Sequence, residues 1–170
     1  MSLAIPYLLD AAAETGPDEV ITILEERITV GTFNDRTQAG ADRFLADGLR
    51  PGDSIRLPSF DSLASIIDSL AAARVGLVLS DMDPTTHART NRPLPTDRYV
   101  SESLLWSESA FASIGGDMIT HGRVIRAARQ DARTLPSELG PLLHAIRAVE
   151  QSVIGTGGGS DTIPVDQLGR

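Results

Sequence analysis

Two residue types are missing from this sequence, and each absence excludes a class of chemistry. None of the 170 residues is cysteine, which excludes disulfides and thiolate metal sites and is typical of a cytoplasmic protein. None is lysine, because all 15 basic side chains are arginine. The chain therefore cannot form a Schiff base through a lysine, and it cannot build a phosphate loop that depends on one.

Long hydrophobic runs and a positive net charge are also absent. No apolar run approaches the roughly 20 residues of a membrane-spanning helix. The first residues lack the basic start of a signal peptide and include Asp10 and Glu14, so we expect an amphipathic helix there. The net charge of −8 argues against general binding to nucleic acid. We therefore expect a cytoplasmic protein whose partners are neither a membrane nor a nucleic acid.

The first half of the chain alternates between strand and helix patterns. Strands are expected at residues 19–24, 27–30, 54–59 and 75–81. A turn at Glu25–Glu26 joins the first two as a hairpin, and the two expected helices follow N-caps at Thr32 and Asp61. Gly48 lies near the end of the first of these helices. The order strand, helix, strand predicts right-handed crossovers and a mostly parallel sheet.

The second half is more varied in composition, and no internal repeat is apparent. Residues 83–98 are rich in proline and polar side chains, as in an exposed loop. Further strands are expected at residues 99–106 and 152–154, and helices at 122–133 and 136–150. We therefore predict a single α/β domain over residues 1–154, followed by a flexible glycine-rich tail at 155–170.

Three short motifs occur in an order that resembles a known family. They are "TVGTF", "GLRPGDSI" and "AARVGLVLSDMDP". Together they resemble the N-terminal region of adenylate-forming enzymes, which include acyl-CoA synthetases, adenylation domains of nonribosomal peptide synthetases, and luciferases. The match covers residues 8–84, about half of the chain. The resemblance implies an α/β fold with a mostly parallel sheet, flanking helices and an N-terminal β-hairpin.

The family continues with a phosphate-binding loop, "T-S-G-T-T-G-x-P-K-G", followed by "V-x-x-T-H". Counting back from "ITHG" at residues 119–122 places that loop on residues 107–116, "SESAFASIGG". Here Glu108 introduces a carboxylate, Phe111 replaces a hydroxyl, and Gly115 stands where the family has its lysine. A carboxylate beside a triphosphate repels it. The family's acidic adenosine- or magnesium-binding motif and its C-terminal lid domain do not follow either. The resemblance therefore implies that this chain alone does not form an acyl-adenylate, and we expect no cofactor and no metal.

Two groups of polar residues are candidates for binding or catalysis. A basic stripe on one predicted helix would bind an anion or an acidic partner, or would be a solvated face paired with nearby acids. It consists of Arg123, Arg126, Arg129 and Arg133. The second group would supply a nucleophile or a base if the chain were an enzyme. It consists of Ser107, Glu108, Ser109 and His121.

The function predicted from these observations is that of a binding protein. We expect a non-catalytic, adenylation-enzyme-like protein that is a binding, assembly or regulatory partner in acyl, amino-acid, polyketide or peptide metabolism. Its partner would be a synthetase, a carrier protein or a second copy of itself, because an adenylation-type fragment exposes a face that must be covered. The alternative is a repurposed acyl pocket, in which the chain is a small enzyme or ligand-binding protein acting on an activated or carrier-bound substrate.

Overall fold

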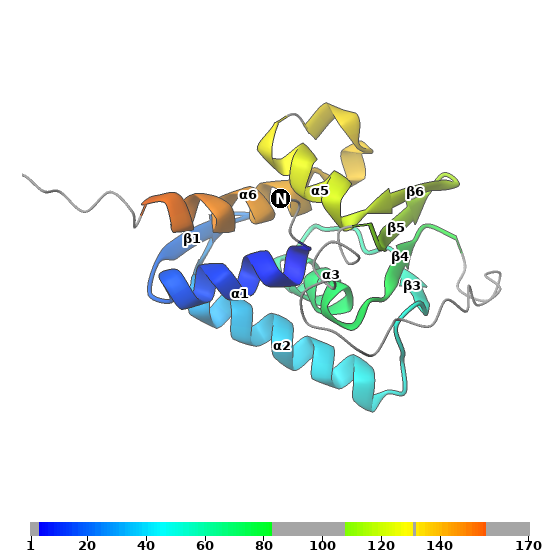
Figure 1. Cartoon of the computed structure of the whole chain (residues 1–170), viewed down its shortest axis with the longest axis horizontal. Coiled ribbons are helices and arrows are strands. Elements are labelled where there is room, and N and C mark those ends of the chain that lie inside the picture. Colours follow the sequence, from blue (N-terminus) through cyan, green and yellow to red (C-terminus); the bar gives the residue numbers. More distant parts are fainter. Residues whose placement is uncertain (1–3, 83–107, 131, 156–170) are drawn as a thin grey trace, which may run out of the picture.

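The computed structural model describes residues 4–82, 108–130 and 132–155. The first helix, α1 (Ile5–Thr15), confirms the helix expected at the start of the chain. Its buried residues are Ile5, Leu8, Leu9 and Ala12. This spacing of three and four residues places them on one face of the helix. Figure 1 shows α1 lying between α6 (Gly140–Gly155) and α2 (Val30–Ala46), and α1 contacts both helices.

Strands β1 (Val20–Ile23) and β2 (Glu26–Thr29) form a separate two-stranded antiparallel sheet. Ile23 pairs with Glu26, so the turn residues are Leu24 and Glu25. The turn was expected one residue later. The reason for the difference is that pairing Ile21 with Ile28 buries both side chains on the same face of the hairpin.

Helix α2 begins directly after β2. Its N-cap is Thr29, whose hydroxyl accepts a hydrogen bond from the backbone N–H of Thr32 at 3.2 Å. The expected cap at Thr32 is therefore wrong, because the earlier start puts Val30 and Phe33 in the core. Gly48 follows the end of the helix with a φ of 89°, a conformation that glycine adopts without strain.

A parallel strand–helix–strand unit comes next, formed by β3 (Ser54–Arg56), α3 (Leu63–Val75) and β4 (Val78–Ser80). Helix α3 is capped by Ser62, which exchanges hydrogen bonds with Ser65 in a capping box. The expected cap at Asp61 is therefore one residue too early. Helix α3 packs against α2, and the two helices make more contacts with each other than any other pair of elements.

Strands β5 (Ala110–Ile114) and β6 (Asp117–Thr120) complete a sheet with the order β3-β4-β5-β6. The β3–β4 and β4–β5 pairs are parallel, and β5–β6 is antiparallel. The prediction of an α/β fold with a mostly parallel sheet and a separate hairpin is confirmed.

Helices form the rest of the described chain. After β6 come α5 (His121–Arg129), two short 3-10 turns (Ala132–Thr134 and Ser137–Leu139) and α6. The strand expected at residues 152–154 is wrong, because these residues continue α6, where Val153 packs against the core one turn after the buried Val149. Gly155, expected in the tail, is the last residue of α6.

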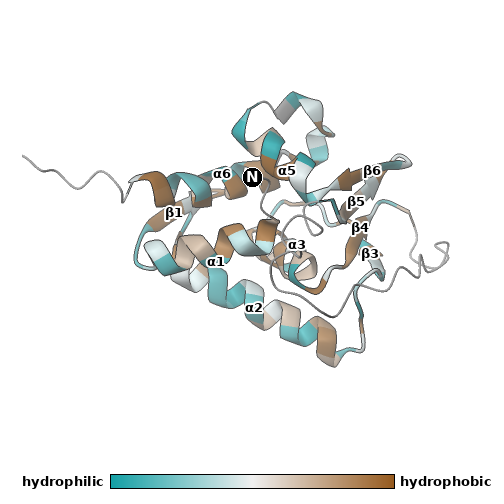
Figure 2. Ribbon diagram, viewed as in Figure 1, coloured by the Kyte–Doolittle hydropathy of each residue, from teal (hydrophilic) through white to brown (hydrophobic). Residues whose placement is uncertain are grey.

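The core lies between the helices and the four-stranded sheet, and three of its largest fully buried side chains are Phe33, Phe60 and Phe111. In the view of Figure 2, α2 is largely hydrophilic, which agrees with the exposed acidic and basic side chains along its outer face. The loop expected at residues 83–98, the strand at 99–106 and the remainder of the tail at 156–170 lie outside the described residues.

Among the residues that the structure describes, no helix is long and apolar enough to cross a membrane.

Candidate functional site

The β5–β6 hairpin lies where the family resemblance places a phosphate-binding loop. Ile114 pairs directly with Asp117, so only Gly115 and Gly116 connect the two strands. Both glycines have positive φ values, 58° and 82°, as in the tight turns that are preferred in β-hairpins. The expectation of a loop over residues 107–116 is therefore wrong for Ala110–Ile114, which form a strand, and the connection is a two-residue turn.

The turn offers little to an anion. A Cβ atom on either Gly115 or Gly116 would meet nothing within 4 Å, so the glycines serve the backbone conformation and not a close approach to another group. The backbone N–H of Gly115 donates a hydrogen bond to a carboxylate oxygen of Asp81 at 2.7 Å. One N–H that could face a phosphate is thus engaged, and its acceptor adds a negative charge at the same place.

His121 is the first residue of α5 and is fully buried. Its ring packs edge-on against the ring of Phe111, with 5.5 Å between the ring centroids. Neither ring nitrogen has a hydrogen-bond partner in the described part of the chain. Burial lowers the pKa of His121 from 6.5 to about 4, because the charged imidazolium loses its solvation. The imidazole is therefore neutral at pH 7 and has no contact with solvent.

The other candidates for catalysis do not join His121 in a reactive group. Glu108 is exposed, and Ser109 is half-buried. The carbonyl of Ser109 accepts a hydrogen bond from the backbone N–H of His121 at 3.1 Å, which brings the two main chains together. Since the imidazole nitrogens lack hydrogen bonds to any described residue, no serine–histidine relay forms there. Ser107 lies outside the described residues.

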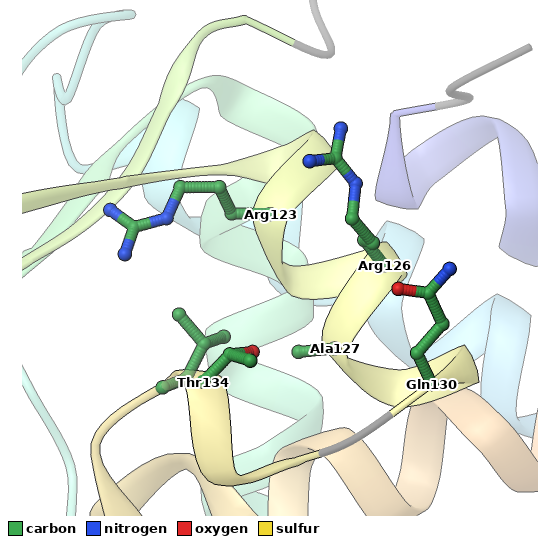
Figure 3. A pocket seen from close by; sticks show the side chains of 6 residues that line it. Arg123, Arg126, Ala127, Gln130 and Thr134 are labelled. Atoms are coloured by element: carbon green, nitrogen blue, oxygen red, sulfur yellow. The ribbon is translucent and has the colours of Figure 1, made fainter.

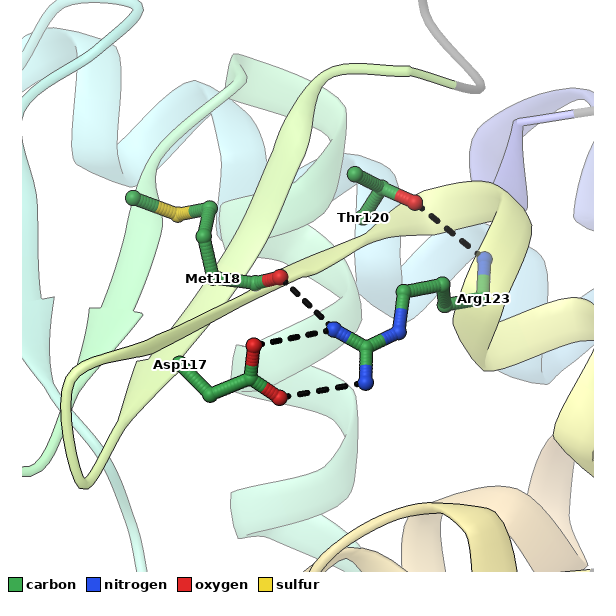
Figure 4. Close-up of polar contacts among 4 residues, drawn as sticks. All are labelled: Asp117, Met118, Thr120 and Arg123. Carbon is green, nitrogen blue, oxygen red and sulfur yellow. Dashed lines mark hydrogen bonds and ion pairs between the residues drawn. The ribbon is translucent and has the colours of Figure 1, made fainter.

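Arg123 has two tasks at the edge of the sheet. Its backbone N–H donates to the hydroxyl of Thr120, which caps α5 (Figure 4). Its guanidinium donates to both carboxylate oxygens of Asp117, at 3.2 and 3.1 Å, and to the carbonyl of Met118 at 2.9 Å. Because β6 is an edge strand, the last contact covers a carbonyl that another strand could otherwise pair with.

The other three arginines of the expected stripe differ in position and pairing. Arg126 is exposed and has no partner among the described residues. Arg129 forms a salt bridge with Glu150 of α6 and so links the two helices. Arg133 lies beyond the end of α5, in the first 3-10 turn. The prediction of one helix carrying all four arginines is therefore wrong, because α5 ends at Arg129.

A groove of about 220 Å³ runs beside α5. Its lining residues are Arg123, Arg126, Ala127, Gln130, Thr134 and Leu135 (Figure 3). The two guanidinium groups and an amide lie at its rim, while the buried Ala127 and Leu135 form its apolar floor. Such a groove can accept a small anionic group. Gln130 could have been found from sequence, since it follows Arg126 by one helical turn, but Leu135 reaches the groove only through the turn after α5.

Within the described residues, no group of three histidine, cysteine, aspartate or glutamate side chains is placed to hold a metal ion.

Comparisons with known proteins bear on the fold. No family model matches the sequence, and no curated protein sequence matches it. A fatty acyl CoA synthetase from Mycobacterium tuberculosis superimposes with a TM-score of 0.58 at 16% identity, over 88% of this chain and 43% of that one. Lower scores, 0.43 and 0.41, belong to the N-terminal domain of FACL13 from the same organism and the N-terminal subdomain of Klebsiella oxytoca NpsA. They match at 20% and 22% identity, over 84% and 70% of this chain and 36% and 29% of those chains.

Only the first of these scores exceeds 0.5, so the comparison rests on that synthetase, of which this chain spans less than half. At such low identity the likeness concerns the fold alone. The chain thus has the fold of part of an adenylate-forming enzyme, as the sequence resemblance implied.

Proposed function

We propose that this chain is a non-catalytic, adenylation-enzyme-like protein that acts as a binding, assembly or regulatory partner in acyl, amino-acid, polyketide or peptide metabolism. The observation that carries the proposal is the two-residue Gly115–Gly116 turn, which replaces the phosphate-binding loop of the family. The fold that resembles a synthetase is present, but the part of it that would hold ATP phosphates is not built from the described residues.

Electrostatics supports the same proposal. The carboxylate of Asp81 accepts from the N–H of Gly115 and would lie beside any phosphate bound at this turn. Two like charges about 4 Å apart repel by roughly 4 kcal/mol at the effective dielectric of a protein surface. With no lysine in the chain, no lysine ammonium can offset this repulsion.

The arginine-lined groove beside α5 is the surface we assign to the partner. Arg126 has no partner in the described part of the chain, and Arg123 is held in place by Asp117, so the groove presents a positively charged rim on an acidic protein. An acidic surface of a carrier protein or a synthetase would complement it. A second copy of this acidic chain is the remaining candidate partner.

The first test is an activity assay. The purified chain, mixed with ATP, magnesium and a panel of carboxylic and amino acids, should show no pyrophosphate exchange, whereas a complete acyl-CoA synthetase in the same assay should show it. Robust exchange by the chain alone would refute the proposal.

The second test concerns the groove. Isothermal titration against a purified carrier protein and a synthetase should identify a binding partner, and Arg126→Glu should weaken that binding about tenfold or more. Arg36→Glu is a matched control, because Arg36 is an exposed arginine on α2 away from the groove. Equal losses for both variants would mean that the charge of the whole chain matters and that the groove is not the binding surface.

A further inference from the structure

A second, larger groove lies between α1 and α6. Its volume is about 570 Å³, and its lining residues are Leu8, Ala11, Arg129, Arg147, Glu150, Gln151, Val153 and Ile154. The apolar part combines the buried Leu8 with Ile154, which is 74% exposed. An isoleucine exposed to this extent beside an apolar groove is typical of a surface that another segment covers.

The charges along this groove are not balanced. Arg129 is neutralised by its salt bridge with Glu150. Arg147 is exposed and has no partner among the described residues. The groove therefore combines apolar side chains with a single uncompensated positive charge, and a matching occupant would be an apolar segment that carries an acidic side chain.

Residues 156–170 have this composition and follow α6 directly. Their sequence is "TGGGSDTIPVDQLGR". Small residues at 156–160 precede a segment in which Ile163 and Val165 alternate with polar residues and Pro164, next to Asp166. We propose that residues 161–166 bind in the groove between α1 and α6 of the same chain, with Asp166 beside Arg147.

The length of the chain permits this arrangement. From Arg147 to Ile154, α6 rises about 10 Å. Residues 156–160 can span up to about 17 Å, which is enough to reverse direction at the end of α6. Residues 161–166, running back along the helix in extended conformation, then cover the groove and bring Asp166 to the level of Arg147. Pro164 favours an extended backbone in this segment and needs no hydrogen-bond acceptor.

Tethering makes even a weak contact effective. A short flexible linker holds the segment at an effective concentration on the order of millimolar, so a contact that would be weak between separate molecules is populated within one chain. The consequence is that the apolar surface of α1 and α6 is covered by the protein itself. This inference concerns a different surface from the arginine-lined groove beside α5, and it does not rest on the proposed function.

The absence of cysteine allows a direct test on the full chain. A disulfide between engineered cysteines at Gln151→Cys, which lines the groove, and Thr162→Cys should form rapidly within one chain under mild oxidation. The matched control combines Thr162→Cys with Gln38→Cys on the exposed face of α2, and this pair should link about tenfold more slowly. The products are separated by mass, which distinguishes links within a chain from links between two chains.

The charge pair is tested in the same assay. Arg147→Glu should slow the formation of the link about fivefold, and adding Asp166→Arg should restore it, whereas Arg36→Glu should have no effect. Equal rates for the groove pair and the α2 pair would overturn the proposal. Links formed mainly between two chains would overturn it as well, because they would mean that the segment of a second copy occupies the groove.

Discussion

The two hairpins of this protein are built to the same plan, and their difference is informative. In each, two short antiparallel strands are joined by a two-residue turn with positive φ values, and a threonine caps a helix that follows at once. The sequences at the junctions are "ITVG" at residues 28–31 and "ITHG" at 119–122. The first hairpin stands alone beside the helices, whereas the second belongs to the main sheet.

The comparison shows that the second hairpin has an ordinary structural purpose. Its turn is made of glycines, whereas the first turn places Leu24 and Glu25 at φ values of 49° and 67°, which L-residues adopt only at a cost. At the equivalent helix start, the first hairpin buries Val30 and the second buries His121. A region that the sequence resemblance associates with nucleotide binding is thus a repeat of a connection already present in the first half.

The largest difference to test is the buried side chain at the start of each helix. His121→Val makes the second hairpin match the first. In the wild type, the folded pKa of about 4 lies below the unfolded value of 6.5, so the unfolded chain takes up the proton first as the pH falls. The associated stability is present above pH 6.5 and is lost between pH 6.5 and 4, by roughly 3 kcal/mol in total at 1.36 kcal/mol per pKa unit.

Urea unfolding of the wild type and the variant at pH 7.5, 5.5 and 4 measures this effect. We expect the stability difference between the two proteins to shift in favour of His121→Val as the pH falls, whatever the small cavity costs at pH 7.5. His144→Gln, which changes an exposed histidine on α6, is the control and should leave the pH dependence unchanged. A parallel pH dependence of His121→Val and the wild type would contradict the assignment.

The turns provide the next comparison. Gly115→Ala and Gly116→Ala should each lower the free energy of unfolding by about 1 kcal/mol, because an added Cβ meets no atom but forces an L-residue into positive φ. Glu25→Gly in the first hairpin should have the opposite sign and stabilise by up to roughly 1 kcal/mol, since strain is relieved while the unfolded chain gains entropy. Chemical denaturation measures all three. If Gly115→Ala and Glu25→Gly changed stability in the same direction, the two turns would not be equivalent.

The smallest expected effect concerns the two caps. Thr29→Ala and Thr120→Ala should each cost up to about 1 kcal/mol, because each removes the side-chain acceptor of a first-turn N–H. Thr→Ser at either position keeps the acceptor and should retain most of the stability. Hydrogen exchange at Thr32 and Arg123, the residues whose N–H groups are capped, reports each loss locally. Unchanged exchange at these two amides would show that the hydroxyls do not stabilise the helix starts.

Much of the fold was predictable because its signals are local. The spacing of apolar residues predicted α1 and α3, and alternating β-branched residues predicted the first hairpin. The caps of α2 and α3 were misplaced because neighbouring Thr, Ser and Asp side chains are all able to cap, and burial of the next residues decides between them. The β5–β6 hairpin was missed because counting back from "ITHG" kept the length of the family's loop. The Gly115–Gly116 pair was the available signal for a tight turn.

Sequence alone determined which chemistries are excluded, since a chain without cysteine or lysine cannot use their side chains in any fold. It also determined the amphipathic faces, which depend only on periodicity. The tertiary structure alone decided that His121 is buried against Phe111, that Arg129 is paired with Glu150, and that Arg126 is left exposed. Burial and pairing depend on residues brought together from distant parts of the chain, and solvation, which sets the pKa of His121, follows from that packing.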